Sequence, residues 1–210
     1  MTGLPRVTLF HAPNSRSLGA RALLEELGVP YDLHVLNLNT GEQRKPEYLA
    51  VNPMGKVPAI VHDGALVTEQ PAVFIYLADL YPQVGLAPPI GDPLRGPYLR
   101  WLVFYGSSFE PAIVDRAQKR EPVPPRACPY GDFDTMLGTL NQQLAKGPYL
   151  LGERFTAADV LWGVALQWTV SLSKLVPSSP QIEAYIELVN SRPAIKRAAA
   201  KDADLAATQA

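Results

Sequence analysis

The stretch from Asn52 to Gln70 contains the features from which a small binding site can be built of main-chain groups. The dipeptide Val57-Pro58 lacks one N–H donor, and an X-Pro bond is the one place where a cis peptide costs only about 0.5–1 kcal/mol. A cis turn there would direct the N–H and C=O of Val57 outward. The segment Thr68–Pro71 then begins a helical pattern. The free N–H groups of its first turn would lie at the same edge and favour an anion.

The elements that would position these groups follow the order β-α-β and then β-β-α. A β-rich run, a turn and an amphipathic helix that stops at Gly28 come first, and an alternating run predicts the next strand. The dipeptide Asp63-Gly64 separates two short apolar runs and predicts a tight hairpin. The predicted elements are strands at 7–11, 31–36, 60–62 and 65–67, a helix at 17–27, and a last helix that ends near Pro82.

The second half of the chain has only helical patterns. Residues 83–91 are rich in Gly and Pro, which predicts a linker between a first domain at 1–82 and a second at 92–210. Thr156 and Asp159 have the spacing of a helix cap, and the apolar run after them predicts a buried helix. The further expected helical segments begin at Asp92-Pro93 and cover 133–144, 160–170 and 182–189, with a short tail at 194–205.

The 52–70 stretch resembles the glutathione site of the glutathione transferase superfamily, which has N-P-x-G-(K/Q)-V-P before a hairpin and (E/Q)-S at the next helix start. A second resemblance is the family's G-x-x-(F/Y)-(T/S)-x-A-D motif, present at Gly152–Asp159. The residues that match the first pattern are Asn52, Pro53, Gly55, Lys56, Val57, Pro58 and Glu69, whereas Gln70 stands where the family usually has Ser. The resemblance implies a thioredoxin-like α/β domain followed by an all-α domain, glutathione as co-substrate without a metal, and a homodimer.

In this family the glutathione thiol is activated as the thiolate, which implies hydrogen-bond donors in the loop after the first strand. That loop here is Asn14-Ser15-Arg16-Ser17. The amide of Asn14 and the hydroxyls of Ser15 and Ser17 can donate, and Arg16 adds positive charge. We expect Asn14 or Ser15 to contact the sulfur. The alternative is that Asn14 only forms a turn and that Ser17 only caps the helix.

The resemblance also implies roles for residues that hold the rest of the tripeptide. Glu69 and Gln70 would hold the γ-glutamyl end, because a carboxylate binds the ligand ammonium while helix N–H groups bind its carboxylate. Lys56 would pair with the glycyl carboxylate, and Val57 and Pro58 would supply main-chain contacts. The alternatives are that Glu69 complements the helix dipole and that Lys56 is a solvated charge.

The acceptor pocket for an apolar electrophile is expected on the first helix of the second domain. Trp101, Tyr105 and Ser108 recur there at helical spacing, although an aromatic stripe of this kind also suits core packing. The three histidines, His11, His34 and His62, are isolated in sequence. We therefore expect no metal site and see no Ser-His-Asp order.

Composition restricts the function classes. The 210 residues are 47% hydrophobic, and 19 basic against 20 acidic residues give a net charge of −1, which argues against a general nucleic-acid or membrane binder. The single Cys128, the missing apolar leader and the missing membrane-length run favour a reducing cytoplasm. The favoured function is a cytoplasmic, detoxifying glutathione transferase. A glutathione-dependent disulfide or peroxide reductase and a non-catalytic binding module of the same fold stay open.

Overall fold

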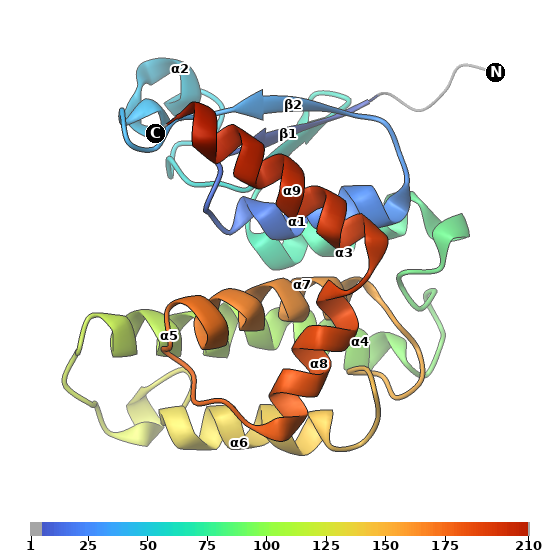
Figure 1. Cartoon of the computed structure of the whole chain (residues 1–210), viewed down its shortest axis with the longest axis vertical. Helices are drawn as coiled ribbons and strands as arrows, with labels where there is room; N and C mark the ends of the chain where they lie inside the picture. The colour runs from blue at the N-terminus through green and yellow to red at the C-terminus, as the bar shows by residue number, and fades with distance from the viewer. Residues whose placement is uncertain (1–5, 210) are drawn as a thin grey trace. The chain divides into compact units, whose positions relative to one another are not determined.

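The computed structural model describes residues 6–209, and the chain divides into two compact units (Figure 1). Unit 1 contains the residues up to Tyr81 together with those from Pro193 onward, and unit 2 is Pro82–Arg192. The expected second domain at 92–210 differs from this division, since its last 18 residues group with unit 1. Residues 1–5 and 210 of the expected domains lie outside the described residues.

The sheet of unit 1 has four strands in the order β2-β1-β3-β4. Strand β1 (Val7–His11) runs parallel to β2 (Tyr31–Val35) and antiparallel to β3 (Ala59–His62), which pairs with β4 (Ala65–Val67). The turn at Asp63-Gly64 has positive φ at both residues, 50° and 77°, as the hairpin prediction requires. The predicted β-α-β and β-β-α order is therefore confirmed.

Two long helices cover the strands of unit 1. Helix α1 (Ser17–Leu27) ends at Gly28 in the left-handed conformation, as the sequence predicts. It packs on β1 and on α3 (Gln70–Leu80), which contacts β3 and β4. Both helices are apolar toward the sheet, with side chains such as Leu23 and Phe74 fully buried. A short helix α2 (Pro46–Leu49) follows a 3-10 turn at Glu42–Arg44.

The expected tail at 194–205 is a helix, α9 (Pro193–Thr208), which lies along α1 in Figure 1. Its buried residues include Ile195, Ala198 and Asp202, which are three and four positions apart and so form one face. This face packs against α1, which explains why the end of the chain belongs to unit 1 and not to the helical unit.

Unit 2 is helical throughout its regular elements. The α-helices are α4 (Arg95–Phe104), α5 (Glu110–Ala117), α6 (Phe133–Leu144), α7 (Ala157–Leu166) and α8 (Pro180–Asn190), and two π-helical segments follow α4 and α7 at Tyr105–Phe109 and Gln167–Leu172. Short 3-10 turns lie at Pro82–Val84 and Pro125–Ala127. Pro111 falls in the first turn of α5, where its missing N–H does no harm, so the helical path continues through it.

A capping box begins α7, as predicted from the sequence. Thr156 and Asp159 exchange side-chain and backbone hydrogen bonds, and the Asp159 carboxylate also accepts bonds from the Leu150 N–H (2.8 Å) and the Tyr185 hydroxyl (2.9 Å). Burial raises the pKa of Asp159 despite these donors. This fully buried carboxylate therefore joins α7, α8 and the segment before α7 into one core.

No helix within residues 6–209 is long and apolar enough to cross a membrane.

Helices α7 and α8 approach closely at Gly163. A Cβ atom built there would lie 2.3 Å from Cγ1 and 2.7 Å from Cβ of Val189, so Gly163→Ala forces the helices apart. We predict a fall in the free energy of unfolding of about 1–3 kcal/mol, measured by urea denaturation. Gly163→Ala combined with Val189→Ala should recover part of this loss.

Gly138 in α6 is the matched control for this prediction. A Cβ atom there meets nothing within 4 Å, so Gly138→Ala should leave stability unchanged or raise it by about 0.5–1 kcal/mol. Equal losses in the two single variants would contradict the close approach at Gly163.

Candidate functional site

The turn before β3 is built around the cis peptide bond Val57-Pro58. The C=O of the preceding Lys56 accepts hydrogen bonds from the Tyr48 hydroxyl (2.6 Å) and the Asn52 side-chain amide (2.9 Å). At Gly55, φ is +61°, and a Cβ atom would lie 2.6 Å from the main-chain oxygen of Gln43. The Asn52–Lys56 loop is thus fixed by the Tyr48 side chain of α2, by its own Asn52 side chain and by a position that only glycine fits.

Val57 keeps its main-chain groups available at this turn. Within the described residues, neither its N–H nor its C=O takes part in a hydrogen bond. Its side chain belongs to a small apolar cluster with Ala12 and Tyr48, so the turn lies beside the segment that follows β1. An extended peptide could pair with the free edge of Val57 as a further strand does.

Glu69 lies at the same end of the hairpin as the Pro58 turn. Ile60 pairs with Val67 in the antiparallel register, and continuing that register places Pro58 opposite Glu69. Glu69 is exposed and has φ 63° and ψ 111°, a conformation that L-residues rarely adopt. Such local strain of about 1–3 kcal/mol is typical of functional sites, because the surrounding structure must maintain it.

A hydrogen bond joins the two helix entrances. The side-chain amide of Gln70, the first residue of α3, donates to the C=O of Arg16, which precedes α1 (3.1 Å). The free N–H groups of the first turn of α3 therefore lie at the same end of unit 1 as the Pro58 turn. The first N–H groups of α1 are already bonded to Ser15 and Arg16, so this helix contributes its dipole and not free donors. This end of the unit has the positive ends of two helix dipoles and two exposed cationic side chains, Lys56 and Arg16.

Asn14 occupies the tip of the loop between β1 and α1. Its φ of 57° is left-handed, a conformation that Asn adopts more easily than most residues. Its N–H donates to Oδ2 of Asp202 in α9 (3.1 Å), while its exposed side-chain amide has no hydrogen-bond partner within residues 6–209. The loop therefore presents a free amide donor on a fixed backbone.

The serines of this loop use their hydroxyls within the protein. The Ser15 hydroxyl donates to the C=O of Ala12 (2.7 Å) and lies 2.7 Å from the Ser17 hydroxyl. Ser17 is fully buried, and its Oγ accepts from the Ala12 N–H (3.1 Å) and lies 2.8 Å from Nδ1 of His11. Ser17 thus fixes the loop, and Ser15 contacts ligand only if its hydroxyl turns from Ala12.

His11 and Asp202 extend this network, and the sequence analysis did not foresee either. Nε2 of the fully buried His11 lies 2.9 Å from Oδ1 of Asp202, in a contact that lacks the alignment of a hydrogen bond. Ser17, His11 and Asp202 are in contact, although the sequence shows no Ser-His-Asp order. All three are buried, so the arrangement joins α9 to the loop and presents no nucleophile to a substrate.

The residues expected to form the acceptor pocket lie in unit 2. Trp101 and Tyr105 are each 1% exposed and pack edge-to-face against Trp162, whose indole N–H donates to the C=O of Trp101 (2.9 Å). These contacts support the alternative of core packing for both aromatics. Ser108 is partly exposed. Among the residues described, no group of three or more His, Cys, Asp or Glu is close enough to hold a metal ion.

The fold combines a thioredoxin-like sheet unit, which has a cis-proline turn, with an all-helical unit. Comparisons with known proteins show which family has this combination. Residues 5–79 match the family model "Glutathione S-transferase, N-terminal domain", and residues 130–188 match "Glutathione S-transferase, C-terminal domain". The chain belongs to the glutathione S-transferase superfamily.

Individual relatives agree with this assignment over almost the whole chain. Glutathione S-transferase GstA of Escherichia coli O157:H7 is 28% identical and aligns over 90% of this chain and 96% of its own length. The disulfide-bond oxidoreductase YfcG of Escherichia coli K12 is also 28% identical and aligns over 93% of this chain and 95% of its own length. The structure of a sphingomonad glutathione S-transferase complexed with glutathione has a TM-score of 0.78 and 30% identity, over 93% and 98%.

The Asp202 network generates a test of how the loop is fixed. Asp202→Ala leaves the Asn14 N–H and the buried His11 without their carboxylate, so the free energy of unfolding should fall by about 1–3 kcal/mol. Hydrogen exchange should become faster at Asn14 and along α9. Asp204→Ala, at an exposed position of the same helix, should change neither quantity. Unchanged exchange at Asn14 in the Asp202 variant would contradict the role given to this carboxylate.

Proposed function

We propose that this protein is a glutathione transferase, which activates the glutathione thiol for attack on small hydrophobic electrophiles. The observation that supports this most directly is the convergence at one end of unit 1 of the Pro58 turn, Glu69 and two helix entrances. Membership of the superfamily and the glutathione bound in the sphingomonad relative support the same ligand.

In the proposed complex, glutathione pairs with the chain as a short extended strand. The N–H and C=O of Val57 bond to the cysteinyl main chain, as in strand addition to a sheet edge. The Glu69 carboxylate binds the γ-glutamyl ammonium, and the free N–H groups of Gln70 and Ala72 bind the γ-glutamyl carboxylate. Lys56 pairs with the glycyl carboxylate.

Asn14 is the first choice for the donor to sulfur. Its side-chain amide is exposed and unpaired among the described residues, whereas the Ser15 hydroxyl would first have to leave Ala12. Lowering a thiol pKa by about two units needs about 2.7 kcal/mol in favour of the anion. One hydrogen bond to a charged group supplies about 1.5–3 kcal/mol, and the entrance of α1 adds about 0.3–1 kcal/mol. Arg16 contributes further positive charge.

The reaction then needs no protein base. The thiol proton passes to solvent as the thiolate forms, the sulfur forms a bond to the electrophilic carbon, and the leaving group departs with its electron pair. Of the residues expected in the acceptor pocket, Trp101 and Tyr105 are buried in unit 2, and Ser108 in the segment after α4 stays a prediction. The proposed setting is a homodimer in the cytoplasm, where glutathione is abundant and Cys128 stays reduced.

Glu69 tests the binding part of this proposal. Glu69→Gln removes the negative charge from the ammonium contact, so the dissociation constant for glutathione should rise about 10- to 150-fold in isothermal titration calorimetry. The turnover number at saturating glutathione should change little. Glu47→Gln, an exposed glutamate of α2, is the control. An unchanged affinity in the Glu69 variant would show that the γ-glutamyl end binds elsewhere.

Asn14 tests the activation part. In Asn14→Ala the thiolate loses its donor, so the pKa of bound glutathione should rise by about one to two units and the pH–rate profile should move to higher pH. Conjugation of a model aryl halide near pH 7 should slow about 10- to 150-fold while the glutathione dissociation constant stays within about threefold. Asn39→Ala, at an exposed loop position, is the control.

The same profile in Ser15→Ala decides between the two donors. A shift in the Ser15 variant with no shift in the Asn14 variant would assign the sulfur contact to Ser15. A loss of rate that is equal at all pH values in both variants would contradict thiol activation by this loop.

A second candidate function is glutathione-linked disulfide reduction, which the similarity to a relative named a disulfide-bond oxidoreductase supports. Two glutathione molecules would reduce one disulfide to two thiols and form glutathione disulfide, so no cysteine of the protein is needed. Rates with hydroxyethyl disulfide and with an aryl halide, measured on one preparation, separate the two activities. A protein that has neither activity and does not bind glutathione would instead be a non-catalytic binding module.

A further inference from the structure

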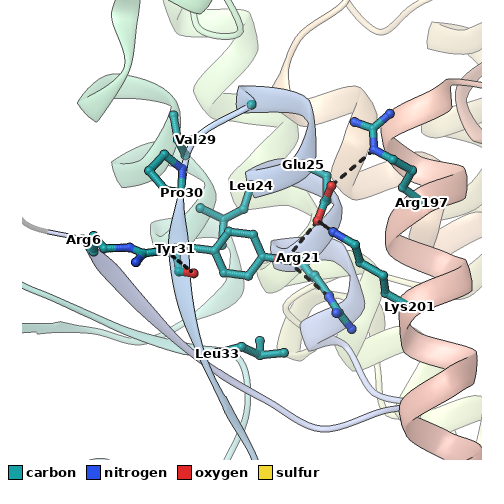
Figure 2. Close-up of a pocket in the computed structure, with 11 residues that line it drawn as sticks. Arg6, Arg21, Leu24, Glu25, Val29, Pro30, Tyr31, Leu33, Arg197 and Lys201 are labelled. Carbon is teal, nitrogen blue, oxygen red and sulfur yellow. Dashed lines mark hydrogen bonds and ion pairs between the residues drawn. The ribbon is translucent and has the colours of Figure 1, made fainter.

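A cavity lies in unit 1 between α1, β2 and α9, and Figure 2 shows the side chains that line it. Its volume is about 560 Å³, and it is open to solvent. Its lining residues include Arg21 in α1 and the turn at 28–31. None of the lining residues belongs to the proposed glutathione site. The cavity therefore requires an explanation of its own.

Four cationic side chains surround this cavity. Arg6 and Arg21 come from the first third of the chain, and Arg197 and Lys201 reach in from α9 (Figure 2). The negative partners are Glu25, which contacts Lys201 and lies 3.4 Å from Nε of Arg197, and Asp32, which lies 3.4 Å from Nε of Arg6.

The carboxylates leave the cluster with two positive charges in excess. Burial raises the pKa of Glu25, but hydrogen bonds from Lys201, Tyr31 and Arg197, with the charge of Lys201, lower it below its ordinary value. Glu25 is therefore ionised at neutral pH, and a surplus of two positive charges remains unbalanced around the cavity.

Arg21 has an unsatisfied donor inside the cluster. Its side chain is 6% exposed and its Nε donates to the Tyr31 hydroxyl at 3.4 Å, but its buried Nη1 has no hydrogen-bond partner among residues 6–209. A buried guanidinium N–H without an acceptor is costly, and native structures rarely retain one. An oxyanion in the cavity would supply the missing acceptor, and a guanidinium binds such groups in a bidentate way.

The rest of the lining is apolar. Leu24, Val29 and Pro30, which are labelled in Figure 2, contribute hydrocarbon surface. A ligand that fills the cavity would therefore have a charged group at Arg21 and an apolar or aromatic group against these residues.

We propose that this cavity binds a phosphomonoester with an apolar substituent, its phosphate held by Arg21, Arg197 and Lys201. A phosphomonoester has a charge of about −1.5 to −2 at pH 7 and three acceptor oxygens, which match the surplus charge and the free donor. The site does not depend on the proposed glutathione chemistry, because the two share no residue.

Binding to the full chain is tested by calorimetry with phenyl phosphate, phenyl sulfate and inorganic phosphate at about pH 8, where the phosphomonoester has two negative charges. We expect one phenyl phosphate per chain. It should bind more tightly than phenyl sulfate, which has one charge, and more tightly than inorganic phosphate, which lacks the ring. Saturating glutathione should not displace it.

Substitutions locate the site. Arg197→Gln and Lys201→Gln replace half-exposed side chains that the fold tolerates, and each should weaken phenyl phosphate binding about tenfold without changing glutathione affinity. Arg21→Met should abolish binding. Lys196→Gln, an exposed cation next to Arg197 that does not line the cavity, should have no effect. No binding at about 10 mM phenyl phosphate, equal effects of all three Gln variants, or displacement by glutathione would overturn the proposal.

Discussion

The buried carboxylate of Asp202 is the contact on which the candidate site depends. Asp202 lies near the end of the chain, yet it accepts the N–H of Asn14 and touches the buried ring of His11 in the first strand. The Asp202 carboxylate can hold the loop between β1 and α1 only because α9 packs against α1. The geometry of the first residues that could meet a thiol is therefore set by the last helix of the protein.

Around that contact, unit 1 builds its site from main-chain groups and not from reactive side chains. The free edge of Val57, the strained backbone of Glu69 and two helix entrances joined by Gln70 lie at one end of the unit. Such a site is suited to a peptide ligand with charged ends. Main-chain donors and acceptors form hydrogen bonds with the backbone of the ligand, and single charged groups bind its charged ends. In the proposed function, activation of the glutathione thiol needs only one donor, and the exposed amide of Asn14 is the proposed one.

Much of this could be predicted from sequence because the signals are local. Asp63-Gly64 defines a hairpin, Gly28 ends a helix, and Thr156 with Asp159 begins one, each through contacts within a few residues. The motif around Pro58 indicated the family for the same reason.

What the sequence did not reveal depends on distant residues. His11 and Asp202 are 191 positions apart, and no spacing rule relates them. The assignment of α9 to unit 1 could not be read from composition, because its buried face becomes evident only against α1. Trp101 and Tyr105 show the opposite difficulty, since helical spacing of aromatics predicts a buried face but does not say whether core or cavity lies beside it.

A crystal structure of the protein with glutathione tests the proposed site most directly. We expect the sulfur within hydrogen-bonding distance of the Asn14 side-chain amide, the cysteinyl main chain paired with Val57, and the γ-glutamyl ammonium in contact with Glu69. A tripeptide bound away from the Pro58 turn, or a sulfur that no residue of the Asn14–Ser17 loop approaches, would contradict the proposed site.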